Sequence, residues 1–108
     1  MNTNIKKNIV IKIGTTSIIK NDNVDITLLK SLAELIIENK NKFNFVIVTS
    51  GAVGLGATKL NYKSRPKSLK RLQVASAVGQ IELINQYEKI FKDKKMNIAQ
   101  VLITKNLI

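Results

Sequence analysis

The stretch that most restricts the fold is residues 9–17 (IVIKIGTTS), an apolar run that ends in a glycine and three hydroxyl side chains. Four of its first five residues are β-branched aliphatics, which favours a strand buried on both faces of a sheet. Lys12 lies inside this run, and Gly14 and Thr15 follow closely. An ammonium group, a small residue and a hydroxyl at the end of a strand suit a phosphate-binding loop. An edge strand followed by an ordinary turn is the alternative.

The rest of the chain alternates strand-like and helical patterns. After a first strand over residues 9–13, the expected elements are a turn at residues 21–23, a helix from an N-cap at Asp25 to about residue 40, a strand over residues 45–48, a helix over residues 52–60, a long helix over residues 67–94 and a strand over residues 96–104. This order predicts an α/β fold of three layers (αβα) with a mostly parallel sheet and right-handed crossovers.

A second loop follows the second strand. Residues 46–53 (VIVTSGAV) run from the strand through Ser50 and Gly51 into a helix at Ala52. Because ligands of parallel α/β sheets bind beyond the carboxyl ends of the strands, this loop and the one at Gly14 are expected at the same edge. Helix-terminal amides and the Ser50 hydroxyl favour a carboxylate or a phosphate. The alternative is a strand–helix turn in which Ser50 only caps the helix.

The glycine spacing in this second loop invites comparison with a Walker A motif. Gly51 and Gly56 have the required separation, but Ala57 stands where that motif needs its lysine. The loop is therefore not a P-loop.

Residues 76–80 (SAVGQ) place a glycine in the middle of the long helical pattern. Gly79 costs about 1 kcal/mol relative to alanine inside a helix. We therefore expect either a kink or close packing against another element at this point. Gln80 is expected to line a polar site or to face solvent.

The composition excludes several classes of function. The chain has 108 residues and contains neither cysteine nor histidine, which excludes disulfides, a Cys/His zinc site and Ser–His or Cys–His catalysis within it. No apolar run approaches the roughly 20 residues of a membrane span, and no signal-peptide core is recognisable. We expect a cytoplasmic protein with no membrane partner.

The formal net charge of +11 raises the question of nucleic-acid binding. The lysines are scattered along the chain, arginine occurs only at Arg65 and Arg71, and aromatic residues make up 5%. Base recognition favours arginine and stacking platforms, so no nucleic-acid partner is expected. A basic protein that handles anionic nucleotides and carboxylates is the better interpretation.

Together, residues 10–17, 46–53 and 76–80 resemble the amino-acid kinase superfamily, and within it the glutamate 5-kinases (gamma-glutamyl kinases). The resemblance runs from about residue 8 to residue 108, in order. The Lys-x-Gly-Thr pattern that starts at Lys12 is shared with aspartokinases, so it is specific only to the superfamily. The Val-Thr-Ser-Gly-Ala and Ala-Val-Gly-Gln stretches narrow the resemblance to glutamate 5-kinases.

This resemblance implies transfer of the γ-phosphoryl group of ATP, with Mg²⁺, to the side-chain carboxylate of L-glutamate, the first step of proline biosynthesis. Lys12 would be the catalytic residue, and no metal ligand is assigned. The residues that would bind substrates are Lys12, Gly14 and Thr15 for ATP, and Ser50, Gly51 and Ala52 for glutamate.

The resemblance also implies a longer protein. The family's kinase domain is considerably longer than this chain, so residues 1–108 would be its N-terminal part with the C-terminal part absent, and a homo-oligomer is expected at full length. Another amino-acid kinase, such as an aspartokinase, and a basic binding remnant without catalysis are the alternative functions.

Overall fold

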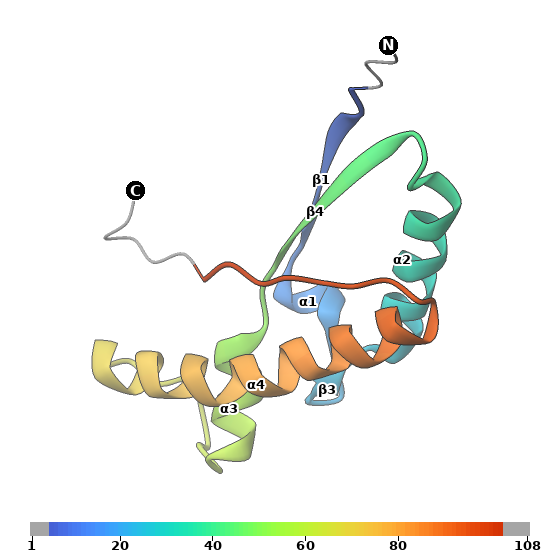
Figure 1. The fold of residues 1–108 in the computed structure, drawn as a ribbon. Helices are drawn as coiled ribbons and strands as arrows, with labels where there is room; N and C mark the ends of the chain where they lie inside the picture. Colours follow the sequence, from blue (N-terminus) through green and yellow to red (C-terminus); the bar gives the residue numbers. More distant parts are fainter. Residues whose placement is uncertain (1–4, 103–108) are drawn as a thin grey trace.

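The computed structural model describes residues 5–102 of the chain. The elements in chain order are β1 (Lys7–Ile13), α1 (Thr15–Ile18), β2 (Ile19–Lys20), β3 (Asn23–Val24), α2 (Ile26–Asn39), β4 (Phe43–Thr49), α3 (Ala52–Lys59) and α4 (Leu69–Asp93). Figure 1 shows β1 and β4 side by side, α2 beside them, and the long α4 with α3 at one end of the pair.

The two long strands form the parallel pair that the element order predicts. The register runs from Lys7 opposite Phe43 to Ile13 opposite Thr49. The first two of the three predicted strands are confirmed, and each begins two residues earlier than expected. A parallel pair needs a long crossover, and α2 lies in that crossover between the two strands.

Only one face of this pair is covered. Ile9, Ile11 and Ile13 alternate with the exposed Val10 and Lys12, and β4 shows the same alternation. The expectation of strands buried on both faces is wrong for the described residues: Val10 is 60% exposed. A second helical layer, which the three-layer prediction requires, is not present in residues 5–102, whereas the α/β class and the parallel pairing are confirmed.

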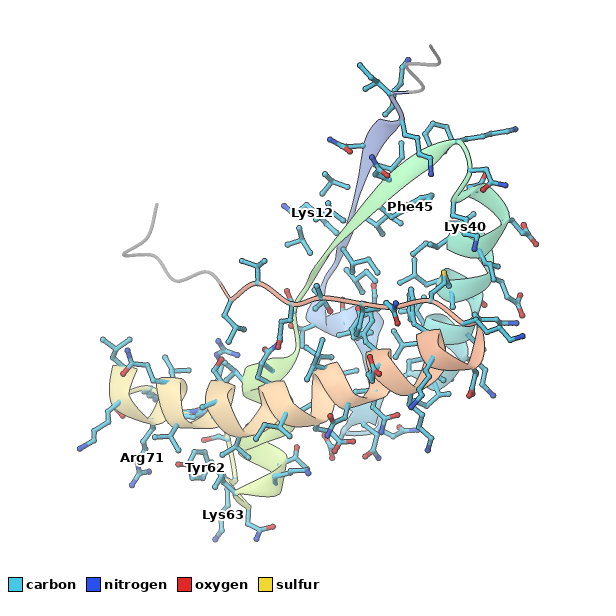
Figure 2. All side chains as sticks on the ribbon, viewed as in Figure 1. Lys12, Lys40, Phe45, Tyr62, Lys63 and Arg71 are labelled. Atoms are coloured by element: carbon cyan, nitrogen blue, oxygen red, sulfur yellow. The ribbon has the colours of Figure 1, made fainter. Side chains whose placement is uncertain are left out.

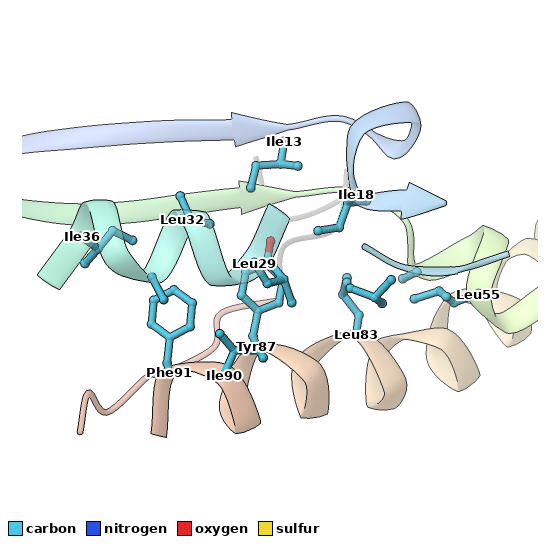
Figure 3. Close-up of a cluster of buried hydrophobic side chains, with 13 residues drawn as sticks. Ile13, Ile18, Leu29, Leu32, Ile36, Leu55, Leu83, Tyr87, Ile90 and Phe91 are labelled. Carbon is cyan, nitrogen blue, oxygen red and sulfur yellow. The ribbon is translucent and has the colours of Figure 1, made fainter. Parts of the chain in front are cut away.

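The core lies between the covered face of the strands, α2 and α4 (Figure 3). α2 begins where the sequence predicts, because the Asp25 carboxylate accepts a hydrogen bond from the backbone N–H of Leu28 at 3.1 Å. Its buried face carries Leu29, Leu32, Ala33 and Ile36. The same cluster takes in Leu83, Tyr87, Ile90 and Phe91 of α4.

The turn predicted at residues 21–23 closes a small antiparallel hairpin, β2–β3. Asn21 and Asp22 have φ of 53° and 63°. Positive φ at both central residues is typical of a type I′ turn, which matches the twist of hairpin strands and favours Asn and Asp. The hairpin itself has no separate signature in the sequence because each of its strands has only two residues.

The predicted third strand is wrong for its described part. No strand forms over residues 96–102, and the remainder of the predicted strand lies outside the described residues. Met96 and Ile98 pack against the core, while Val101 and Leu102 are exposed. Figure 1 shows this segment running across the direction of β1 and β4, so its backbone cannot form a ladder with them.

Candidate functional site

The two predicted loops meet at the carboxyl ends of β1 and β4. The register pairs Ile13 with Thr49, and the backbone N–H of Ser50 donates to the carbonyl oxygen of Ile13 at 2.9 Å. Lys12 and Ser50 therefore lie at the same rim of the sheet, as expected from parallel topology. Lys12 stands opposite Val48 on the exposed face, and Ser50 is also exposed.

The first loop is short and open. Gly14 is the N-cap of α1 with an extended backbone, and its carbonyl accepts from the N–H groups of Ser17 and Ile18, both at 3.0 Å. A Cβ added to Gly14 would meet nothing within 4 Å. Gly14 and Thr15 are exposed, so the predicted phosphate-binding residues are accessible.

Gly51 joins the second loop to the first. Its φ of 109° lies in the region that favours glycine, and a Cβ there would come within 2.9 Å of Ile18 Cγ2 and 3.1 Å of Ile19 Cδ1. Gly51 and Ala52 are buried. Of the three residues predicted to bind glutamate, Ser50 is therefore the one whose side chain is open to a ligand.

The alternative role of Ser50 as a helix cap is wrong. The N-cap of α3 is Gly51, and no side-chain hydrogen bond caps this helix. The Ser50 hydroxyl is not needed to satisfy the helix, so it is available to donate to an anion.

Behind the rim, a buried tyrosine ties α4 to the end of β4. The Tyr87 hydroxyl donates to Thr49 Oγ1 at 2.9 Å, and Thr49 Oγ1 donates to the carbonyl oxygen of Ser50 at 3.2 Å. Burial raises the pKa of Tyr87, and the hydrogen bond with Thr49 opposes that rise. This pair was not predictable from the sequence, where Tyr87 is only one apolar position of a helical pattern.

Close backbone packing of α3 against α4 holds the second loop from the other side. A Cβ on Gly79 would lie 1.7 Å from the Ala52 carbonyl oxygen, and one on Gly56 would lie 1.6 Å from the Ala75 carbonyl oxygen. The predicted close packing at Gly79 is confirmed, and α4 continues through it as one helix. Gln80 is half-buried.

The charges at the rim favour an anionic ligand. The ion pairs within residues 5–102 are Lys59–Glu82 at 3.2 Å and Lys94–Glu34 at 4.0 Å, so no described carboxylate neutralises Lys12. No group of three or more His, Cys, Asp or Glu side chains that could hold a metal ion occurs among the described residues. None of the described helices is both long enough and apolar enough to cross a membrane.

These features describe an α/β protein with an exposed lysine and an exposed serine at the carboxyl ends of two parallel strands, and comparison with known proteins places it in a family. Residues 7–108 match the Amino acid kinase family, and the chain belongs to that family. This agrees with the superfamily expected from the motifs at Lys12 and Ser50.

The resemblance to glutamate 5-kinases is also confirmed. A glutamate 5-kinase from Prochlorococcus marinus (strain MIT 9312) is 48% identical over 101 residues, which cover 89% of this chain and 27% of the relative. A glutamate 5-kinase from Enterococcus faecalis is 39% identical over 104 residues, which cover 94% of this chain and 38% of the relative. The chain thus spans between about a quarter and two-fifths of these relatives.

Proposed function

We propose that this chain supplies the N-terminal part of a glutamate 5-kinase site, which phosphorylates the side-chain carboxylate of L-glutamate with ATP. The observation that carries the proposal is the position of Lys12 and Ser50 at one rim, joined through the hydrogen bond from Ser50 N to Ile13 O. Lys12, Gly14 and Thr15 would contact the ATP phosphates, and Ser50 would bind glutamate, with Gly51 and Ala52 contributing backbone.

The chemistry follows from charge. Transfer to a carboxylate brings two anionic groups together, so catalysis depends on positioning and on neutralising charge. A carboxylate oxygen forms a bond to the γ-phosphorus of ATP. At the same time the bond between the γ-phosphorus and the oxygen that bridges it to the β-phosphorus breaks, and that oxygen leaves with the ADP. Lys12 would offset the negative charge of the phosphoryl oxygens. The Ser50 hydroxyl would donate to the carboxyl group and hold it in line. No covalent enzyme intermediate is required.

The described residues contain no group of three or more His, Cys, Asp or Glu side chains that could hold a metal ion by themselves. Mg²⁺ that enters with ATP would be held mainly by the nucleotide phosphates and by water molecules. We therefore assign no step to a metal ligand of residues 5–102.

The test joins this chain to the remaining C-terminal part of the Enterococcus faecalis relative and assays phosphorylation of glutamate, with hydroxylamine to trap the acyl phosphate. Lys12→Ala should lower kcat by about 100- to 1,000-fold, the scale of losing one transition-state charge contact, and change KM for glutamate little. Ser50→Ala should instead raise KM for glutamate by roughly tenfold, because one hydrogen bond to a charged group is lost.

Lys20→Ala is the matched control, since Lys20 is an exposed lysine on β2 and should leave both constants unchanged. Phosphorylation of aspartate but not of glutamate would replace the proposal with an aspartokinase-like activity. Unchanged kinetics in both the Lys12 and the Ser50 variants would refute the assigned roles.

A further inference from the structure

A basic concavity lies at the opposite end of α3 from Ser50. It is formed by the loop between α3 and α4 and the first turn of α4, and it is lined by residues 61–68 and Arg71. Its volume is about 610 Å³, which is in the range of small-molecule sites. Figure 2 shows Tyr62, Lys63 and Arg71 together at this end of the molecule, away from Lys12.

The charge of this segment is one-sided. Residues 59–71 contain no acid and carry the cations Lys59, Lys63, Arg65, Lys67, Lys70 and Arg71. Lys59 pairs with Glu82 at 3.2 Å, and the other five have no ion pair among the described residues. Four of those five line the concavity. Positive charges that line one hollow without a carboxylate raise the local concentration of anions.

The two ends of the loop that carries these cations are held by hydrogen bonds. The backbone N–H of Tyr62 donates to the Ala57 carbonyl at 2.8 Å, and the N–H of Arg71 donates to Ser68 Oγ at 3.2 Å. The Arg71 guanidinium lies over the Tyr62 ring, with Cζ 5.8 Å from the ring centroid, and Pro66 is buried. These contacts fix the two ends of the loop, so an anion that binds here would have to order only the backbone between them.

We propose that this concavity binds a small phosphoryl-rich anion, such as a triphosphate chain that is either free or part of a nucleotide. The guanidinium groups of Arg65 and Arg71 suit phosphate oxygens because their planar donors can bind two oxygens at once. A nucleic acid is disfavoured because Arg71 already lies over one face of the Tyr62 ring, which leaves this ring a single face for stacking a base. This site is independent of the function proposed for Lys12 and Ser50.

The test titrates inorganic tripolyphosphate into the 108-residue chain at about 0.15 M salt, where long-range attraction is screened beyond roughly 8 Å. In NMR spectra, the changes in backbone amide chemical shift on titration should concentrate in residues 61–71. The double variant Arg65→Gln/Lys67→Gln should weaken binding by about tenfold or more, because each lost contact is a charged hydrogen bond. Lys89→Gln/Lys92→Gln removes the same charge from exposed positions at the other end of α4 and should change affinity by less than about twofold.

A comparison of ATP with tripolyphosphate identifies the source of the phosphates. ATP that binds as tightly as tripolyphosphate would show that the phosphate chain is what the site recognises, and tighter ATP binding would point to a nucleotide. Equal weakening by both double variants would reduce the effect to net charge and overturn the proposal. Amide shifts centred on residues 12–17, or a single-stranded DNA that outcompetes tripolyphosphate at equal phosphate concentration, would overturn it as well.

Discussion

Gly79→Ala tests whether the backbones of α3 and α4 are in direct contact. The added Cβ would lie 1.7 Å from the Ala52 carbonyl oxygen and 2.6 Å from the Gly56 nitrogen. Real Cβ atoms essentially never come within 3.0 Å of such atoms, so the helices must move apart by about 1.3 Å at this point. The obstacle is backbone rather than a flexible side chain, and rotamer changes cannot relieve it.

The expected change in the free energy of unfolding for Gly79→Ala is the sum of two opposing effects. Alanine has the better helix propensity, which on its own would raise the free energy of unfolding by about 1 kcal/mol. Overpacking lowers that free energy by about 1–3 kcal/mol, and more where backbone must shift. We expect a net loss of about 2 kcal/mol, which for a chain of this size corresponds to a Tm lowered by roughly 8–16 °C.

Gly54→Ala is the matched control, because it makes the same chemical change within α3 where a Cβ would meet nothing within 4 Å. This variant should be more stable than the wild type by about 0.5–1 kcal/mol. Both are compared by thermal melting and urea unfolding followed by far-UV circular dichroism. The reasoning is refuted if Gly79→Ala melts within about 2 °C of the wild type, or if the two alanine variants shift Tm in the same direction.

Three smaller predictions use the same unfolding assay. Tyr87→Phe removes the hydroxyl that donates to Thr49 and should lower the free energy of unfolding by about 1 kcal/mol. Because burial raises the pKa of Tyr87 above its ordinary value of 10.0, stability should be full below pH 10 and fall above it, and the fall should be smaller in Tyr87→Phe. Asp25→Ala should cost about 1 kcal/mol through loss of the cap on α2, and Asp25→Asn should retain most of that stability.

Features that depend on a few neighbouring residues were predictable from the sequence. The cap at Asp25 acts on Leu28, three residues away, and the Asn21–Asp22 turn needs only residues that tolerate positive φ. The shared rim of Lys12 and Ser50 was also predictable, because parallel strands joined by a crossover place their carboxyl ends together whatever the side chains are.

Features that need a partner far along the chain were not predictable. The Tyr87–Thr49 hydrogen bond joins residues separated by 38 positions. The close packing at Gly79 against the loops was expected, but the particular contact with the Ala52 carbonyl oxygen was not, since the first residue of α3 looks like any small residue in the sequence. The basic concavity was not predictable from the scattered lysines and the two arginines taken singly, because its signal is the absence of any acid over residues 59–71.

The predictions of a third strand and of strands buried on both faces were wrong for a common physical reason. An apolar, β-branched segment becomes a strand only when a neighbouring strand accepts its backbone hydrogen bonds, and residues 96–102 cross β1 and β4 instead of lying along them. Likewise, the exposed Val10, Val46 and Val48 have the composition of a buried face but no described element covers them. The radius of gyration, 15.7 Å against about 13 Å for a compact chain of this length, reflects the same open arrangement.

The side chain of Lys12 projects from the exposed face of the strands, but the contacts that fix the backbone of the rim lie between the strands or on their covered side, within the described residues. The Ser50–Ile13 hydrogen bond, the fit of Gly51 against Ile18 and the Tyr87–Thr49 bond need nothing beyond residue 87. The backbone of the rim is therefore set by contacts that do not involve the exposed face. A substitution on that face, such as Val10→Thr, should alter solubility and association without moving Lys12 relative to Ser50.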